Sequence, residues 1–174
     1  GIQESNICVA ISESTKNEFL SRYQPPDGWR CDVIRWGVDE KVFHPLNRDD
    51  EDMQLLHEEI RNQYDSADEA ALSAEPDTET PLLLAVGRLV ARKGYRLLLS
   101  SMPAILKDHP KAKLVIVGRG HMRKTLLKQA KNLGVESSIF IESSLSFEEL
   151  AQLYRSADLV IYPSYYEGQG LIPL

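Results

Sequence analysis

Short apolar runs alternate with helical patterns over the second half of the chain. Four such runs are predicted to be buried strands: Leu82–Val86, Leu114–Val117, Ile139–Ile141 and Leu159–Tyr162. Between them, apolar residues recur three or four positions apart, which is the spacing of one helix face. Strands that alternate with helices in this way require right-handed crossovers and a parallel sheet. The pattern therefore predicts an α/β fold, with a parallel sheet flanked by helices.

The first 81 residues follow a less regular pattern. Ile7–Ile11 and Val33–Ile34 are predicted to be two further short strands. Apolar residues at helical spacing then predict one amphipathic helix, through Met53, Leu56, Ile60 and Tyr64. The acidic stretch Asp65–Pro81 is poor in large apolar residues, so burial cannot offset the entropy lost when it orders. We therefore expect this stretch to be a mobile linker.

Composition and charge exclude some classes of function. The 174 residues carry a formal net charge of -6, which argues against binding of nucleic acid through bulk charge. No apolar run approaches the roughly 18 residues that a membrane-spanning helix needs. The four histidines have no metal-ligand spacing, so no metal site is expected. Cys8 and Cys31 show neither paired nor metal-like spacing, and we expect reduced thiols of a cytoplasmic protein, with a disulfide as the less favoured alternative.

A basic segment that contains glycine follows the strand Leu82–Val86. Gly87 permits a tight turn, and Arg88, Arg92 and Lys93 then precede the next predicted helix. A helix amino terminus attracts anions through its free amide groups and its dipole. Arginine can hold a phosphate with two parallel hydrogen bonds, and lysine adds a point charge. The segment predicts a phosphate site, and a solvated basic loop is the alternative.

An acidic side chain follows the last predicted strand. Pro163 ends the run Leu159–Tyr162, and Glu167 comes next in a loop that contains Gly168 and Gly170. In an open parallel sheet, ligands bind in the crevice beyond the carboxyl ends of the strands. Glu167 is therefore predicted to lie where a ligand would bind.

Three segments of the chain together resemble family-4 (group 1) retaining glycosyltransferases. Pro163–Leu171 is similar to that family's donor-sugar loop, Pro-Ser-x-x-Glu-Gly-x-Gly-Leu. Gly87–Gly94 resembles its diphosphate-binding segment, and Trp36–Pro45 resembles the crossing between its two domains. The resemblance covers residues 7–45 and 82–174.

The resemblance implies a GT-B fold, in which two Rossmann-like domains face each other. On this basis, residues 1–45 would be the end of an acceptor-binding domain and the hinge, and residues 46–81 the amphipathic helix and the mobile linker. Residues 82–174 would be part of the nucleotide-sugar-binding domain. The chain would then be a piece of a longer enzyme, and inactive on its own.

The resemblance also implies a reaction, the transfer of a sugar from a nucleotide-diphosphate donor to an acceptor with retention of anomeric configuration. It implies that Glu167 contacts the donor sugar as the catalytic residue. The donor would be held by Gly87, Arg88, Lys93, Gly118, Leu145, Gly168, Gly170 and Leu171, without a metal cofactor. The acceptor stays open among a glycan, a lipid and a small molecule. A peripheral association with the cytoplasmic face of a membrane, through the missing acceptor domain, stays open too.

Alternative readings remain for the function and for one of the loops. A glycogen-synthase-like or sucrose-phosphate-synthase-like enzyme would share the fold and the donor loops. A non-catalytic nucleotide-binding module is a second alternative, because Trp36, Ser143 and Gln169 depart from the residues usual in the family. For Gly118 and Gly120, a purely structural turn is as well supported as a ligand contact. The transferase is favoured because several family motifs occur in the family's order.

Overall fold

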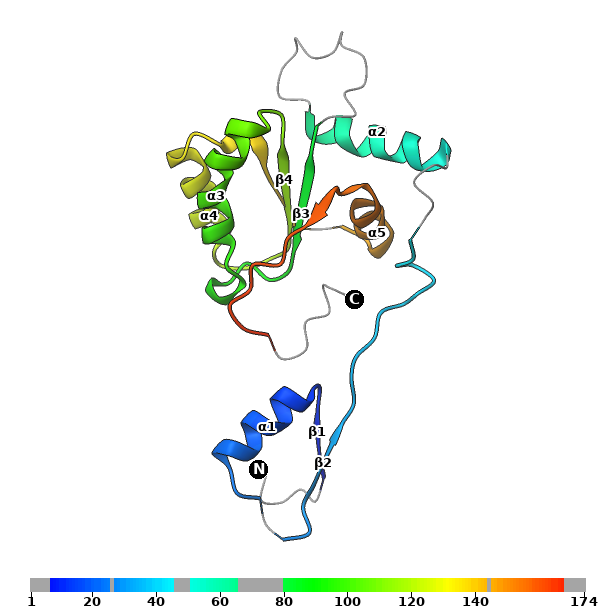
Figure 1. Cartoon of the computed structure of the whole chain (residues 1–174), viewed down its shortest axis with the longest axis vertical. Helices are drawn as coiled ribbons and strands as arrows, with labels where there is room; N and C mark the ends of the chain where they lie inside the picture. Colours follow the sequence, from blue (N-terminus) through cyan, green and yellow to red (C-terminus); the bar gives the residue numbers. More distant parts are fainter. Residues whose placement is uncertain (1–6, 26, 46–50, 66–79, 144, 168–174) are drawn as a thin grey trace. The chain divides into compact units, whose positions relative to one another are not determined.

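The computed structural model describes the chain in five segments, residues 7–25, 27–45, 51–65, 80–143 and 145–167. The chain divides into two compact units: the smaller comprises residues 1–39 with 166–174, and the larger comprises residues 40–165. Figure 1 shows the elements of both units. The predicted mobile linker falls almost wholly outside the described residues, so its mobility stays a prediction.

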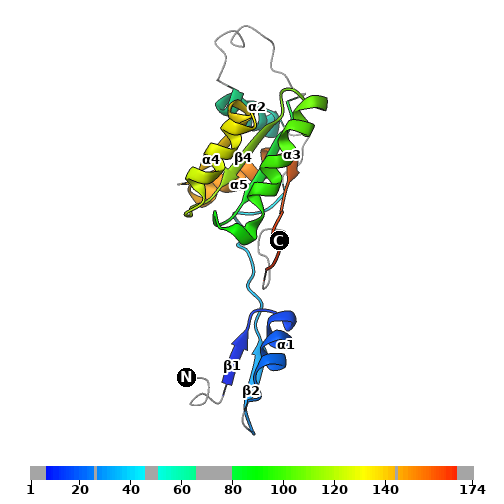
Figure 2. The ribbon, with the colours of Figure 1, turned by 90° about the vertical axis from the view of Figure 1, so that its left-hand side faces the viewer.

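The smaller unit consists of two strands and one helix: β1 (Ile7–Ala10), α1 (Glu13–Arg22) and β2 (Arg30–Val33). The strands are parallel and pair in register, with Cys8 opposite Cys31. α1 packs against both strands, beside which it lies in Figure 2. Its first turn is capped by Ser12, whose hydroxyl accepts a hydrogen bond of 3.1 Å from the Thr15 amide. The predicted strand Ile7–Ile11 is confirmed, whereas the second strand lies earlier than predicted and shares only Val33 with the predicted Val33–Ile34.

The larger unit contains a four-stranded parallel sheet with the strand order β5-β4-β3-β6. Its strands are β3 (Leu82–Val86), β4 (Lys113–Val117), β5 (Ile139–Glu142) and β6 (Leu159–Val160). Each strand begins within one residue of the position that the apolar runs predict. The central strands β3 and β4 are buried on both faces, which explains why they are continuous apolar runs rather than alternating ones. The predicted α/β fold is confirmed.

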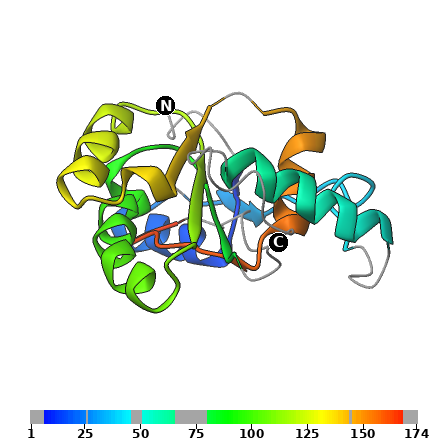
Figure 3. The ribbon, with the colours of Figure 1, turned by 90° about the horizontal axis from the view of Figure 1, so that it is seen from above.

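Four helices cover the two faces of this sheet: α2 (Glu51–Asp65), α3 (Tyr95–Asp108), α4 (Arg123–Asn132) and α5 (Phe147–Ser156). α3 and α4 lie side by side on one face, and α2 and α5 lie on the other (Figures 1, 2 and 3). Because side chains alternate along a strand, Leu83 packs under α3 and α4 while Leu82 and Leu84 pack under α2 and α5. Two single-turn helices, η3 (Ala91–Lys93) and η4 (Glu136–Ser138), lie in the connections.

The carboxylate of Asp158 joins three elements at one end of the sheet. One guanidinium nitrogen of Arg61, on α2, donates hydrogen bonds of 3.0 Å to both oxygens of this carboxylate. The backbone amide of Leu82, at the start of β3, donates a further bond of 2.7 Å to it. Since Asp158 immediately precedes β6, one side chain ties α2 and β3 to the edge strand.

The segment before α2 is held on α5. The ring of Phe43 lies edge-on to Phe147 and Tyr154, with centroid distances of 6.4 and 6.0 Å. Arg155 donates to the carbonyl oxygens of Val42 and His44 at 2.7 and 3.3 Å. These contacts attach the segment that enters the larger unit to one face of its sheet.

Of the helices in the described part of the chain, none combines the length and the apolar character needed to cross a bilayer.

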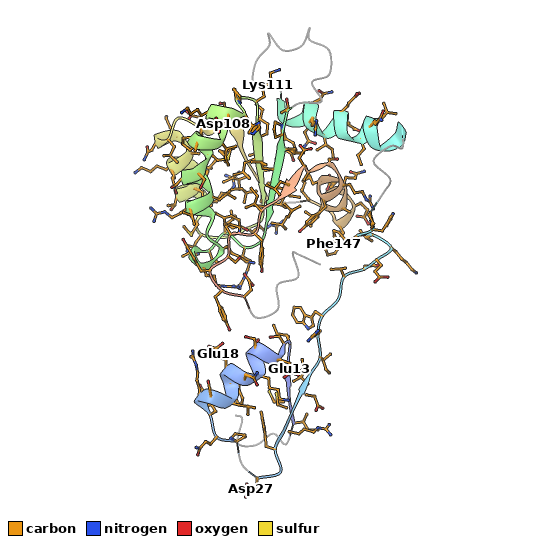
Figure 4. All side chains as sticks on the ribbon, in the orientation of Figure 1. Glu13, Glu18, Asp27, Asp108, Lys111 and Phe147 are labelled. Atoms are coloured by element: carbon orange, nitrogen blue, oxygen red, sulfur yellow. The ribbon has the colours of Figure 1, made fainter. Side chains whose placement is uncertain are left out.

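We predict that Asp158→Ala lowers the free energy of unfolding by about 1–3 kcal/mol, because it removes hydrogen bonds to a charged acceptor and leaves Arg61 without this partner. Urea unfolding followed by circular dichroism measures the change. Asp108→Ala is the control, because this aspartate is exposed at the end of α3 (Figure 4). Equal, small effects of the two substitutions would show that Asp158 does not stabilise the sheet.

Candidate functional site

The candidate site is built from loops at the carboxyl edge of the four-stranded sheet. Because all four strands are parallel, the loops that follow them emerge at this one edge. Gly87 follows β3, Gly118 follows β4, and Ser143 follows β5. The loops that carry the predicted donor-binding residues before Tyr162 therefore lie at the end of the larger unit at which β3 and β4 end (Figure 1).

The loops after β3 and β4 are joined through their backbones. The amide of Gly87 donates to the Val117 carbonyl at 2.9 Å, and the amide of Leu89 donates to the Arg119 carbonyl at 2.8 Å. A Cβ on Gly118 would lie 2.0 Å from the Gly87 carbonyl oxygen, which is too close for the Cβ of any side chain. The glycine at position 118 thus has a structural reason that is independent of any ligand, and its contact with the donor stays a prediction.

The predicted anion-binding lysine is buried. Lys93 lies in η3 and is only 7% exposed. Its ammonium nitrogen lies 5.1 Å from the centroid of the Tyr162 ring, which is a cation–π contact. A Cβ on Gly87 would lie 3.2 Å from the same nitrogen and 3.0 Å from the Tyr95 hydroxyl oxygen. The lysine side chain therefore extends back to the carboxyl end of β3, between the loops after β3 and β6.

The two predicted phosphate ligands differ in their surroundings. The side chain of Arg88 is exposed, whereas that of Lys93 is enclosed by Gly87 and two tyrosines. A solvated basic loop does not describe Lys93, because burying an ammonium group is costly unless the site compensates its charge. It remains a fair description of Arg88.

The acidic loop is fastened to the lysine segment by backbone contacts. The amide of Tyr165 donates to the Arg92 carbonyl at 2.8 Å. Gly94 has a left-handed φ of +71°, and a Cβ there would lie 2.0 Å from the Pro163 carbonyl oxygen. Gly94 is thus required twice, by its backbone angle and by the closeness of Pro163. The segment Tyr162–Tyr165 and the turn that carries Lys93 form one rigid edge of the site.

The remaining predicted site residues have no contact with the loop that carries Lys93 among those described above. Glu167 is half-buried and groups with the smaller unit, directly after the chain leaves the larger one at Tyr165. Leu145 is half-buried and packs against the apolar cluster under α2 and α5. The predicted donor contacts Gly168, Gly170 and Leu171 lie outside the described residues.

The loops after β4 and β5 are also linked, at the place predicted for the nucleotide base. Arg119 donates through Nε to the Ser143 carbonyl at 2.5 Å. Arg123, at the start of α4, donates to the Ile141 carbonyl at 3.2 Å. These bonds tie the end of β5 and Ser143 to the loop after β4 and to the start of α4.

The site combines features that favour an anion. A buried ammonium group lies beside a glycine, and the amino terminus of the 14-residue helix α3 begins at the next turn. Within the described ranges, there is no cluster of three or more His, Cys, Asp or Glu residues that could hold a metal ion. The described edge thus brings a buried cation and a helix amino terminus together.

The sequence did not single out Tyr162 and Tyr95 as parts of this site, whereas Pro163 begins the segment that resembles the donor-sugar loop. The ring of Tyr162 packs against the ammonium of Lys93. Its role depends on β6 lying next to β3, which the order of elements along the chain does not reveal. The signal that could have found it is its position immediately before Pro163, at the end of a strand.

Solved structures with the same architecture are GT-B glycosyltransferases. Sucrose-phosphate synthase from Thermosynechococcus elongatus matches with a TM-score of 0.69 and 23% identity, over 98% of this chain and 38% of that one. Anabaena HepE, solved in complex with UDP and glucose, matches with a TM-score of 0.68 and 18% identity, over 94% of this chain and 39% of that one. The fold is therefore α/β and Rossmann-like, of the GT-B type.

Residues 67–174 match the family model of the glycosyl transferases group 1. The chain belongs to this family. An uncharacterized glycosyltransferase of Methanocaldococcus jannaschii is 34% identical over 98% of this chain and 40% of its own length. Glycogen synthase of Mycobacterium tuberculosis is 34% identical over 66% of this chain and 28% of its own length. The chain thus spans less than half the length of these relatives.

We predict that Gly94→Ala destabilises the larger unit by at least about 1 kcal/mol more than Gly134→Ala does. Both glycines have a left-handed φ, +71° and +66°, so both substitutions carry the same backbone penalty. Only at Gly94 does the new Cβ meet an atom, the Pro163 carbonyl oxygen, since nothing lies within 4 Å of a Cβ on Gly134. Thermal unfolding of the two variants measures the difference. Equal destabilisation would contradict the close packing of the two loops.

Proposed function

We propose that this chain carries the donor-binding edge of a family-4 retaining glycosyltransferase. In this reaction a sugar moves from a nucleotide-diphosphate donor to an acceptor, with retention of anomeric configuration. The observation that carries the proposal is the buried ammonium of Lys93 beside Gly87, next to the amino terminus of α3. Membership of the group 1 family supports it, as does the UDP bound to Anabaena HepE, a protein of the same fold.

In the proposed complex, the diphosphate is neutralised by protein cations. Lys93 supplies a point charge from inside the loop, and Arg88 approaches from the exposed side with its planar guanidinium. The amino terminus of α3 adds a favourable dipole. The charge of the diphosphate is then balanced without a metal ion.

The glycines would let the donor approach the backbone. Gly87 and Gly118 lie at the ends of the two central strands, and Leu145 would contact the nucleotide base. Gly168, Gly170 and Leu171 would complete the donor-sugar loop in the same way. Gly87 has a positive φ of +139°, and a Cβ there would meet the Lys93 side chain and the Tyr95 hydroxyl oxygen, so only a glycine leaves the lysine in this position.

Glu167 would act on the donor sugar. A carboxylate beside the anomeric carbon stabilises the positive charge that develops there as the bond to the diphosphate breaks. The departing diphosphate gains negative charge at the same moment, which Lys93 and Arg88 would stabilise.

A glycogen-synthase-like or sucrose-phosphate-synthase-like enzyme is the second candidate. The match to Mycobacterium tuberculosis glycogen synthase and the likeness to a sucrose-phosphate synthase favour it. It would use the same donor edge, so that the acceptor alone distinguishes it from the other transferases. Turnover of several sugar nucleotides with glycan, lipid and small-molecule acceptors, followed by mass spectrometry of the full-length protein, separates these candidates. It also separates them from a non-catalytic nucleotide-binding module, which would bind donors and turn over none.

We predict that Lys93→Ala weakens binding of a nucleoside diphosphate by about 1.5–3 kcal/mol, the scale of a hydrogen bond to a charged group. The loss should be much smaller for the corresponding nucleoside, because it lacks the diphosphate. Titration calorimetry with both ligands measures the two values. Lys107→Ala, an exposed lysine in the last turn of α3, is the control. Equal losses for the two ligands would assign Lys93 to the base or to structure alone.

For Glu167→Gln in the full-length enzyme, we expect turnover to fall about 10²-fold or more, the scale of losing an electrostatic contact in the transition state. Affinity for the nucleoside diphosphate should stay close to that of the wild type, because the diphosphate is bound elsewhere. Glu136→Gln, at the exposed first residue of η4, is the matched control. Turnover near the wild-type level would remove Glu167 from the mechanism.

A further inference from the structure

The two cysteines of the chain lie directly opposite each other in the smaller unit. Cys8 is the second residue of β1, Cys31 is the second residue of β2, and the two are register partners in the parallel pair. Neighbouring strands lie about 4.7–4.9 Å apart, and disulfides span Cα–Cα distances of about 4.4–6.8 Å. The backbone therefore already holds the two residues at a separation that a disulfide requires.

Their side chains face the same way. Register partners in a parallel pair project to the same face of the sheet, and Cys8 shares its face of β1 with the buried Ala10. Both thiols are free and half-buried, which leaves part of each accessible to a small reagent. Burial raises the pKa of the Cys31 thiol, and the Cys8 thiol raises it further as a neighbouring charge and hydrogen-bond partner. The pairing of the strands and the shared face thus bring the two thiols together.

We propose that Cys8 and Cys31 form a reversible disulfide by exchange with a small-molecule disulfide such as oxidised glutathione. The expectation of two unrelated thiols was drawn from their spacing along the chain. The spacing does not show whether the two cysteines are close in space, because the residues between them form α1 and its connections. The chain then returns beside β1, where Cys31 pairs with Cys8. The proposal concerns the smaller unit alone and is independent of donor binding.

The exchange proceeds in two balanced steps. The thiolate of one cysteine attacks a sulfur atom of oxidised glutathione, forming a mixed disulfide and releasing one glutathione thiolate. The thiolate of the other cysteine then attacks the protein sulfur of the mixed disulfide and releases the second glutathione. The two thiol protons end on the two released glutathione molecules. One S–S bond is broken, one is formed, and the protein dithiol is oxidised as glutathione disulfide is reduced.

The surroundings set the rate of this exchange. Because the thiolate is the attacking species, the raised pKa of Cys31 slows its attack at neutral pH, and the rate should rise with pH. The charged groups that act on Cys31 are Lys16, which favours its thiolate, and Asp32, which opposes it. Once formed, the bond closes a loop through β1, α1 and β2, which constrains the unfolded chain and stabilises the smaller unit.

The test uses the reduced chain, incubated in buffers with increasing ratios of oxidised to reduced glutathione, then quenched with acid and alkylated. We expect a monomer that carries no alkyl group and is lighter than the unmodified dithiol chain by two hydrogen atoms. In this product the peptide of Cys8 is linked to that of Cys31. Dithiothreitol should restore the original mass. Cys8→Ser and Cys31→Ser should instead each retain one glutathione on the remaining cysteine, because the second step is absent.

A parallel incubation in urea separates the effect of the fold from that of chain proximity. The native chain should favour the disulfide by about tenfold or more over the unfolded chain, since the strands raise the effective concentration of one thiol at the other. Equal equilibrium constants in the two conditions would overturn the proposal. Two separate glutathione adducts on the wild type, or disulfide-linked dimers, would overturn it as well, and this readout needs no variant to fold.

Discussion

The contact between Gly94 and the carbonyl of Pro163 is the constraint on which the candidate site depends. It brings the turn after β3 against the segment after β6, two stretches some 70 residues apart in the chain. Only a glycine fits at this point, because a side chain would overlap the carbonyl and the backbone is left-handed. The hydrogen bond from Tyr165 to Arg92 reinforces the contact. As a result, the lysine turn and the start of the acidic loop hold one geometry.

The position of Lys93 follows from this contact. Tyr162 is the residue before Pro163, so the contact of Pro163 with Gly94 also places the Tyr162 ring against the lysine ammonium. On the other side, the absence of a side chain at Gly87 leaves the space that the ammonium occupies. A charged group held in this way has lost most of its hydration and part of its conformational freedom before a ligand binds. An anion that binds here would meet an ammonium group that is already ordered, so binding avoids the entropy cost of ordering the lysine, which is the physical basis of the proposed diphosphate site.

The apolar runs predicted the fold because a strand of a parallel sheet that is buried on both faces is a continuous apolar segment, which can be recognised in the sequence. β3 and β4 were found nearly to the residue, and α2 was found from Ile60 and Tyr64, which are both buried. Strand order, however, is a property of long-range packing, and no local pattern shows that β6 lies beside β3. For the same reason the sequence could name Lys93 but not Tyr162, and could name Cys8 and Cys31 but not their pairing. For Gly118 the sequence left a ligand contact and a structural turn open, and the structure shows that backbone packing requires a glycine there, as it does at Gly94.

The central claim is that the Lys93 ammonium binds the diphosphate of a nucleotide donor. Two-dimensional NMR of the lysine ammonium groups tests it most directly, with the Lys93 signal assigned from its loss in Lys93→Arg. Burial should slow proton exchange enough for this signal to be observed. The account predicts that a nucleoside diphosphate shifts the Lys93 signal while the matching nucleoside leaves it almost unchanged. A Lys93 signal that stays in place while the diphosphate binds would contradict the account.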